Sequence, residues 1–254
     1  MILILNFYIS DMLEISIKAE QVFNIGSYII TNSLFLSFVV LLVLAGLAYC
    51  LRKKMKEVPG LFQNIVESCL EALLTLMDSI LGDRKKSEKY LPLIATIFIF
   101  ILVSNWMGLL PGVGSLLIRQ DGKTVPLFRS PAADLNFTLT LAIMSVIVTN
   151  FLGITVLGFF GHVKKYFNFS NPINFFVGLL ELVSEISKMI SFSFRLFGNI
   201  FAGEVLLTIV FFLVPYVVPI PFMFVELFFG AIQAFIFSIL TLVFLSVHVA
   251  GHEH

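Results

Sequence analysis

Charged residues and cysteines are both scarce in this sequence. Charged side chains make up 13% of its 254 residues, roughly half the fraction that is usual in soluble domains. A chain that is also 59% hydrophobic has too little polar surface to cover itself in water, so we expect it to be embedded in lipid. Its net charge is zero, which gives no indication of nucleic acid or of a strongly acidic partner.

The motifs of common enzyme and metal sites are missing as well. Cys50 and Cys69 do not form a disulfide or zinc framework, so they predict ordinary apolar packing. The sequence has no glycine-rich phosphate loop, nucleophile elbow or zinc-binding helix motif. His248, His252 and His254 lie near the C-terminus, where we expect a frayed end rather than a metal site. The sequence therefore predicts no metal, no cofactor and no covalent chemistry within this chain.

Long apolar stretches predict five membrane-crossing helices, because a span needs about 20 mostly apolar residues. We place the spans at residues 29–51, 91–112, 135–160, 173–214 and 222–249. Residues 61–81 instead combine apolar residues at helical spacing with Glu67, Glu71 and Asp78 on the opposite face, which predicts an amphipathic helix at the interface. Residues 1–28 and 113–133 are predicted to be external, and 83–89 a charged loop. The predicted fold class is an all-α membrane protein with one membrane domain.

The fourth predicted span is unusually long. Residues 173–214 contain no proline, and as one helix they would measure ~63 Å, twice the hydrocarbon thickness of a bilayer. This segment must therefore either fold into a hairpin or tilt strongly.

The distribution of basic residues predicts the orientation. One set of loops holds ten of them, namely Arg52, Lys53, Lys54, Lys56, Arg84, Lys85, Lys86, Lys89, Lys164 and Lys165. The other set holds four, Lys18, Arg119, Lys123 and Arg129. Because basic loops stay in the cytoplasm, we expect the N-terminus outside and the C-terminus inside.

Several charged residues fall inside the predicted spans. They are Glu181, Glu185, Lys188, Arg195, Glu204 and Glu226. Each costs at least ~2.5 kcal/mol at the membrane centre, so each is a functional candidate. Glu181, Glu185 and Lys188 share one side of a helix near its cytoplasmic end, where they form either a local ion-pair cluster or a point of ion access.

Arg195 has no acidic neighbour one turn away on its own helix, where only Ser191 and Asn199 are found. Arginine does not deprotonate in proteins, so its partner carboxylate must come from another helix or another chain. A structural ion pair with Glu226, or a side chain that reaches to the interface, is the alternative. Glu204 lies nine residues further on, at ~180° around the helix.

Other polar residues complete the pattern. Glu226 and Gln233 share one face of the last span, and with Arg195, Ser191 and Asn199 they suit a proton path, although Gln233 could be a plain interhelical hydrogen bond. Asn105 and Asn150 are expected to join helices, and Asp134 to cap one.

Four segments of the chain resemble subunit a of F-type ATP synthases. They are SNWMGLLPG at 104–112, PAADLNFT at 131–138, SFSFRLFGNIFAGE at 191–204 and QAFIFSILTLVFLS at 233–246. The resemblance covers most of the chain from about residue 29. It implies a stator beside a rotating ring of c subunits, each with one carboxylate, and two offset half-channels through which protons load and unload to drive ATP synthesis.

The resemblance also implies roles for residues. Arg195 would face the ring, drive each carboxylate to release its proton and block direct leakage. Glu204 and Glu226, with Asn199, Gln233 and Asp134, would line the outer half-channel, and Ser191 would lie near the inner one. Some relatives pair one carboxylate with a histidine, whereas this chain has glutamate at both positions.

The same resemblance implies long, tilted last spans, which favours one helix over 173–214. It implies the c ring, the b-subunit peripheral stalk, the complete complex and the lipid bilayer as partners, and a bacterial inner membrane as the location, with an organellar inner membrane as the alternative. A proton-coupled secondary transporter or a structural scaffold are the competing functions, although a transporter would show internal repeats and none is evident.

Overall fold

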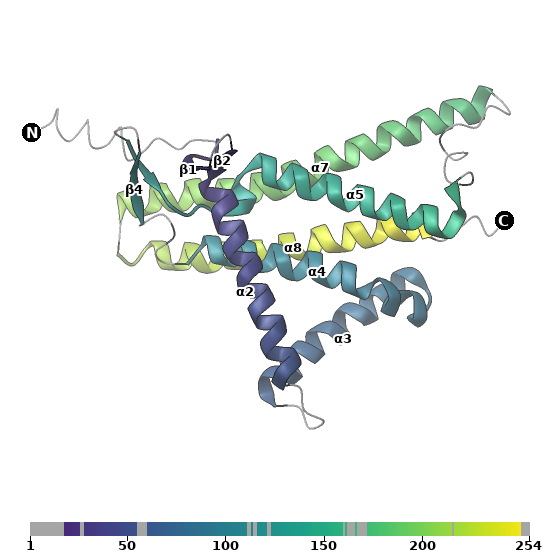
Figure 1. Cartoon of the computed structure of the whole chain (residues 1–254), viewed down its shortest axis with the longest axis horizontal. Coiled ribbons are helices and arrows are strands. Elements are labelled where there is room, and N and C mark those ends of the chain that lie inside the picture. The colour runs from purple at the N-terminus through teal and green to yellow at the C-terminus, as the bar shows by residue number, and fades with distance from the viewer. Residues whose placement is uncertain are drawn as a thin grey trace, which may run out of the picture.

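The computed structural model describes residues 18–25, 28–54, 60–110, 113, 116–120, 123–159, 161, 166, 172–214 and 216–249. Five of its helices are long and apolar enough to cross a membrane, and the predicted all-α membrane class is confirmed. The long helices α4 (Arg84–Gly108), α5 (Leu135–Leu157), α7 (Pro172–Leu213) and α8 (Pro219–Val249) pack on one another, with α8 in contact with the other three (Figure 1). We call these helices the bundle.

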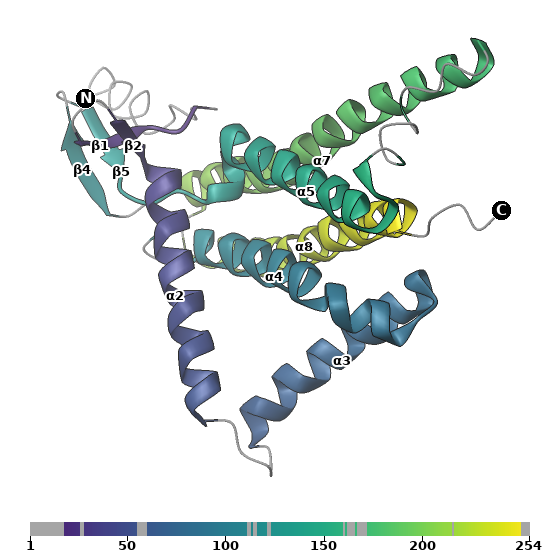
Figure 2. The ribbon, with the colours of Figure 1, turned by 45° about the vertical axis from the view of Figure 1, so that its right-hand side comes forward.

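Two helices branch from this bundle. α2 (Asn32–Lys54) leaves it at a steep angle, and α3 (Leu61–Leu81) returns along the start of α4 (Figure 2). α3 occupies the segment in which an amphipathic helix is predicted. Cys50 on α2 and Cys69 on α3 are both exposed free thiols, so the prediction that they pack among apolar side chains of this chain is wrong.

The chain outside the spans is more ordered than predicted. Antiparallel hairpins form from β1 (Gln21–Ile25) with β2 (Tyr28–Thr31) and from β4 (Leu117–Gln120) with β5 (Lys123–Pro126). The 3₁₀ turn η1 (Pro131–Ala133) follows and leads into α5. The predicted external segments 1–28 and 113–133 thus contain short strands. Pairing of such strands depends on contacts with the neighbouring strand, which the spacing of apolar residues does not reveal.

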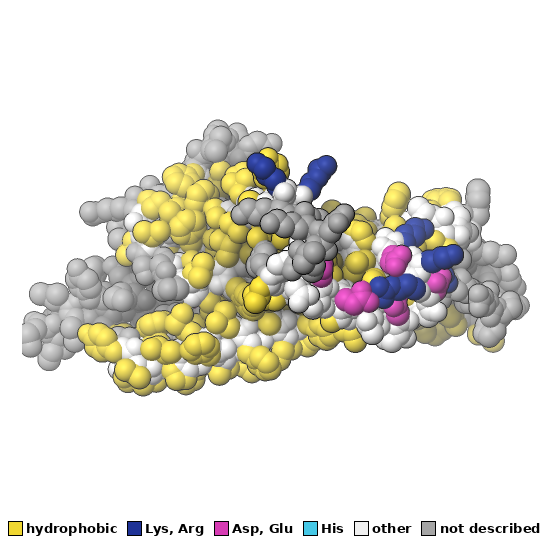
Figure 3. Space-filling view, turned by 90° about the horizontal axis from the view of Figure 1, so that it is seen from below, with side chains coloured by type: hydrophobic (Ala, Val, Ile, Leu, Met, Phe, Trp, Pro, Cys, Tyr) yellow, Lys and Arg dark blue, Asp and Glu magenta, His cyan; other side chains and the backbone are white. Residues whose placement is uncertain are grey.

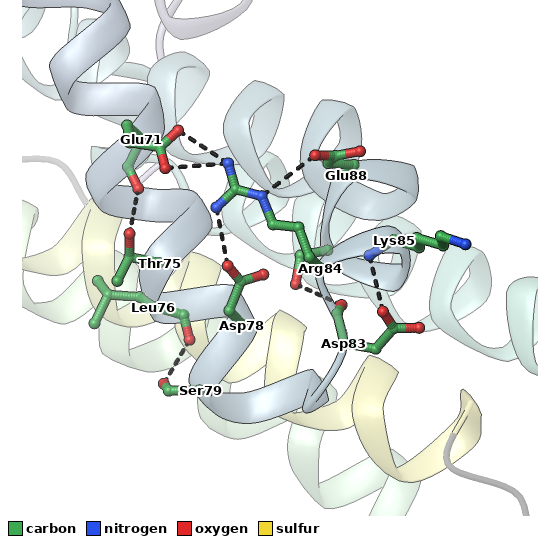
Figure 4. A network of polar contacts seen from close by, with 10 residues as sticks. Glu71, Thr75, Leu76, Asp78, Ser79, Asp83, Arg84, Lys85 and Glu88 are labelled. Carbon is green, nitrogen blue, oxygen red and sulfur yellow. Dashed lines mark hydrogen bonds and ion pairs between the residues drawn. The ribbon is translucent and has the colours of Figure 1, made fainter.

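The charged segment 83–89, predicted as a loop, is the first part of α4. Asp83 caps this helix by accepting a hydrogen bond from the Lys85 backbone N–H at 3.0 Å, and lysine and glutamate are good helix formers. Arg84 then binds carboxylates of both helices, with Nη2 to Glu71 at 3.0 Å, Nη1 to Asp78 at 2.9 Å and Nε to Glu88 at 3.3 Å (Figure 4).

Figure 3 shows most of the charged side chains on one face gathered at the junction of α3 and α4, while hydrophobic side chains dominate the rest of that face. Such exposed ion pairs stabilise a fold only slightly. They fix where α3 meets α4 rather than adding much to stability.

The long segment 173–214 is a single helix. α7 has 42 residues, so the hairpin alternative is wrong. α7 runs antiparallel to α8, so the N-terminal end of α7 and the C-terminal end of α8 lie at the same end of the bundle (Figure 1). A large apolar core lies between α4, α5, α7 and α8 and includes Ile101, Phe192, Leu196 and Phe237.

Buried polar pairs fix the helices relative to one another. The Asn105 side-chain amide donates to the Gly230 carbonyl of α8 at 3.0 Å, which confirms its predicted role between helices. The Thr138 and Ser193 hydroxyls lie 3.0 Å apart. In lipid, such hydrogen bonds and close packing hold helices together where the hydrophobic effect cannot.

Candidate functional site

Arg195 lies on an exposed side of α7. Its Nη2 donates only a long hydrogen bond, 3.4 Å, to the Ser191 hydroxyl one turn earlier. Within the part of the chain that the structure describes, no carboxylate lies at ion-pairing distance from its guanidinium. The alternative ion pair between Arg195 and Glu226 is therefore wrong. Phe194 beside it is 56% exposed, so the arginine sits at an apolar surface open to lipid or to another chain.

One turn beyond Arg195, α7 and α8 are joined by an amide pair. The Asn199 Nδ2 donates to the Gln233 Oε1 at 2.7 Å, and Gln233 is buried. The predicted interhelical hydrogen bond of Gln233 is thus confirmed. The bond also places a polar pair next to Arg195, on the side of the C-terminal end of α7.

One further turn along, Glu226 of α8 packs against Gly203 of α7. Glu226 is 6% exposed, and its Oε1 finds no hydrogen-bond partner among the described residues. A Cβ placed on Gly203 would overlap the Glu226 carboxyl group. The carboxyl group therefore occupies the space that a side chain at position 203 would need.

We expect Gly203→Ala to slow proton movement through this site. The Glu226 carboxyl group must shift to admit the methyl group, and overpacking of this kind costs about 1–3 kcal/mol of folding stability. Because the carboxyl group is moved from its position against α7, the passive proton flux of the assembled protein should fall. Gly46→Ala on α2 is the control, because nothing lies within 4 Å of its Cβ. Equal fluxes in the two variants would show that the Gly203–Glu226 contact does not matter.

Glu204 pairs with Arg129, a residue of the predicted external loop 113–133. The Arg129 Nε lies 3.3 Å from the Glu204 carboxylate, and Arg129 is 7% exposed. Its Nη1 also donates to the Lys18 carbonyl at 3.2 Å, and its guanidinium lies 5.9 Å from the centre of the Phe201 ring. Arg129 therefore belongs to the site.

A signal for Arg129 was present in the sequence. Glu204 lies near the end of its helix that faces the predicted external loops, and those loops hold only four basic residues. One of them was a reasonable counter-ion, but the choice among the four depends on tertiary contacts.

Asp134 serves as a helix cap. Its Oδ1 accepts from the Asn136 N–H at 2.9 Å at the start of α5, and its Oδ2 accepts from the Ser33 hydroxyl at 2.6 Å. The capping prediction is confirmed, and the same carboxylate ties α5 to α2. Its hydrogen bonds do not reach Asn199, Gln233, Glu204 or Glu226.

On the other side of Arg195 there is an open pocket of about 260 Å³, which we call the cavity. It is lined by Ser184, Ser187, Lys188, Ser191, Phe192, Arg195, Leu240 and Phe244. It extends from Arg195 toward the N-terminal end of α7, the opposite direction from Asn199 and Glu204. Three serine hydroxyls and two cations give it polar groups that can hold water.

The ion-pair cluster predicted near Glu185 is present beside this cavity. The Lys188 Nζ donates to Glu185 Oε1 at 2.7 Å, and Glu185 is buried. Glu181 lies one turn earlier on α7 and is half-buried. Asn150 contacts Glu185 from α5 at 3.4 Å, which agrees with its predicted role between helices.

His248 differs from the prediction of a frayed terminus. It lies in the last turn of α8 and is 1% exposed. Its Nε2 is 3.7 Å from Glu185 Oε1. His252 and His254 lie outside the described residues. No group of three potential metal ligands occurs among the residues that the structure describes.

Two polar routes therefore approach Arg195 from opposite directions. The outer route contains Glu204 with Arg129, then Glu226 against Gly203, then the Asn199–Gln233 pair. The inner route is the serine-lined cavity with Lys188 and Glu185. Carboxyl groups and water can carry protons along each route, whereas the permanent charge of Arg195 opposes a proton that moves directly between them.

Known proteins are similar in sequence to this chain over nearly its whole length. The family described as ATP synthase A chain matches residues 33–246. The ATP synthase subunit a of Campylobacter jejuni subsp. jejuni serotype O:23/36 (strain 81-176) is 36% identical over 243 residues, or 94% of each chain. That of Helicobacter pylori (strain Shi470) is 36% identical over 243 residues, or 92% of this chain and 98% of the relative. That of Moorella thermoacetica is 30% identical over 236 residues, or 93% and 99%. The matched segment includes Arg195 and the carboxyl groups of both routes.

Proposed function

The chain belongs to the ATP synthase subunit a family. We propose that Arg195 is the fixed charge past which carboxylates of a second protein move. The protein is the proton-translocating stator subunit in the membrane sector of the H⁺-transporting ATP synthase, a multi-pass membrane protein within that complex. Family membership decides against the secondary transporter and the structural scaffold.

The second protein in this proposal is a ring of c subunits, each with one carboxylate. The observation that carries the proposal is the state of Arg195, which is exposed at an apolar surface and has no carboxylate from the described part of its chain beside it. A guanidinium left uncompensated in the membrane is costly, so a mobile carboxylate from outside the chain accounts for its position. The opposite charge favours the ionised carboxylate and so makes it release its proton.

The two polar routes are the half-channels of the proposal. The outer route, through Glu204, Glu226, Asn199 and Gln233, loads a proton onto a ring carboxylate. The inner route, from Ser191 through the cavity to Lys188 and Glu185, exchanges it with the other side. Because the routes approach Arg195 from opposite ends of α7, a proton crosses only by travelling on the ring. Asp134 contributes by holding the start of α5 beside the outer route.

We assign the outer route to the external side and the inner route to the cytoplasm. The larger count of basic residues in the loops at the inner end supports this orientation, with the N-terminus outside and the C-terminus inside. The curated relatives come from bacteria, which favours a bacterial inner membrane over an organellar one. The charged junction of α3 and α4, held by Arg84, suits contact with the b-subunit peripheral stalk.

Purification of the protein from its native membrane tests these partners. We expect the complete complex to contain an oligomeric ring of small two-span subunits with one membrane carboxylate each, together with a stalk subunit. Chemical crosslinks from exposed positions of α7 around Arg195 should reach the ring. A complex in which that face of α7 crosslinks only to lipid or to the stalk would contradict the proposal.

A further inference from the structure

A cluster of polar side chains from separate segments closes around Glu185. α5 contributes Asn150, the segment between α5 and α7 contributes Tyr166, α7 contributes Glu185 and Lys188, and α8 contributes His248. The Lys188 Nζ binds Glu185 Oε1 at 2.7 Å, Asn150 Nδ2 binds Oε2 at 3.4 Å, and the Tyr166 hydroxyl donates to Asn150 Oδ1 at 3.0 Å. Buried charged groups are rare unless they are paired or have a function.

The hydrogen bonds of His248 show which of its nitrogens can change its protonation. Nδ1 lies 2.7 Å from the Phe244 carbonyl oxygen one turn earlier. A carbonyl can only accept, so Nδ1 carries a hydrogen in both the neutral and the charged imidazole. Nε2 is therefore the nitrogen that gains or loses a proton, and it faces Glu185 Oε1 at 3.7 Å. That distance is beyond a direct hydrogen bond, and a small shift of either side chain would bring the two atoms into contact.

Lys188 connects this cluster with the site at Arg195. It lines the same cavity as Ser184, Ser187, Ser191 and Arg195, and its ammonium group binds Glu185. The Lys188 ammonium group also lies 4.4 Å from the centre of the Phe244 ring. Phe244 is the residue whose backbone carbonyl binds His248. The cavity therefore reaches the cluster through Lys188, and Glu185 lies between Lys188 and His248.

The other members of the cluster are poor proton carriers. Asn150 does not titrate. Burial, together with the nearby carboxylates Glu185 and Glu181, raises the pKa of the Tyr166 hydroxyl, so Tyr166 remains a neutral donor. Among the described residues, Glu185 of α7 faces His248, and Lys188 and Glu181 lie one turn to either side of Glu185 on the same helix. Imidazole is the group whose charge changes in the physiological pH range.

We propose that His248 is a proton-carrying residue at the inner end of the inner route, passing protons between the cytoplasm and Glu185. The proposal rests on the function proposed above. When a proton moves from the cytoplasm toward Arg195, the Nε2–H bond of the charged imidazole breaks and an O–H bond forms on the Glu185 carboxylate, while Nδ1–H stays on the Phe244 carbonyl. Nε2 then takes a new proton from cytoplasmic water. In the opposite direction Glu185 returns its proton to Nε2, and His248 gives it up to cytoplasmic water. His248 lies two residues beyond the segment 33–246 that matches the family.

His248→Asn in the complete complex tests the proposal. The asparagine amide can keep the bond to the Phe244 carbonyl but cannot carry a proton. We expect normal assembly and a passive proton flux through the membrane sector that is slower by about tenfold. The wild-type flux should change with cytoplasmic pH across the range in which imidazole titrates, and this change should disappear in the variant. Ser246→Ala, on a half-buried position of α8 whose hydroxyl donates only to the Val243 carbonyl, is the matched control.

A flux and pH profile equal to the wild type in His248→Asn would overturn the proposal. A purely structural tie would instead lower assembly or thermal stability and leave the pH profile of the assembled fraction unchanged, and that result would also overturn it. His248→Gln carries the same test should the asparagine variant not assemble. Arg195→Ala, measured beside these variants, keeps the two proposals distinct, because it must lose coupled pumping whatever His248 does.

Discussion

Replacing Arg195 by alanine is expected to abolish ATP-driven proton pumping while the complex still assembles. Two unit charges about 4 Å apart attract by ~4 kcal/mol at an effective dielectric constant of 20. This attraction lowers the proton affinity of a carboxylate about a thousandfold. Without this attraction, a ring carboxylate that reaches α7 keeps its proton. The measurement is acidification of membrane vesicles driven by ATP, with assembly checked by the co-purified subunits.

The same variant should leak. In the wild type the guanidinium lies between the Asn199–Gln233 pair and the serine-lined cavity and repels a proton that moves straight from one to the other. We therefore expect the passive proton flux in Arg195→Ala to persist although pumping is lost. Arg195→Lys should also lose coupling, because a buried amine can give up its charge and arginine cannot. An assembled alanine variant that pumps at the native rate would refute this role for Arg195.

Glu204→Gln should produce the second large effect, a passive proton flux slower by about tenfold or more. Glutamine fills the same space but cannot bind and release a proton. The flux should fall in both directions, because the outer route serves loading and unloading alike. The measurement is proton movement through membrane vesicles stripped of the nucleotide-hydrolysing part, under an imposed potential.

The ion pair with Arg129 supplies the internal check on this prediction. Arg129→Gln leaves the Glu204 carboxylate without its counter-ion and should also slow the flux, whereas Lys85→Gln removes an exposed cation far from the site and should not. If the two residues act as a unit, the double variant should be no slower than Glu204→Gln alone. Additive losses would show that Arg129 acts elsewhere.

The features that the sequence predicted well are those that depend on local pattern. Apolar length located the five spans, and the absence of an acid one turn from Arg195 predicted its unpaired state. Asp134 as a cap and Asn105 as a tie between helices followed from residue type and position. The length of 173–214 could not by itself decide between a hairpin and one helix, and the family resemblance decided it correctly.

The features that were missed depend on contacts between distant segments. Arg129 reaches Glu204 across 75 positions of sequence, so no local period points to their ion pair. His248 looked like part of a loose terminus because it lies six residues from the end, yet α8 continues to Val249 and buries it. The two hairpins are not predicted from the sequence, because the apolar pattern of such short strands is weak.

The position of Arg195 in the assembled membrane sector tests the central claim most directly. We predict that a structure of the complete complex places its guanidinium within about 4–6 Å of a carboxylate from another chain, with no carboxylate of its own chain equally near. A structure in which Arg195 instead forms its ion pair with Glu204 or Glu226, while the ring carboxylates lie elsewhere, would contradict the claim.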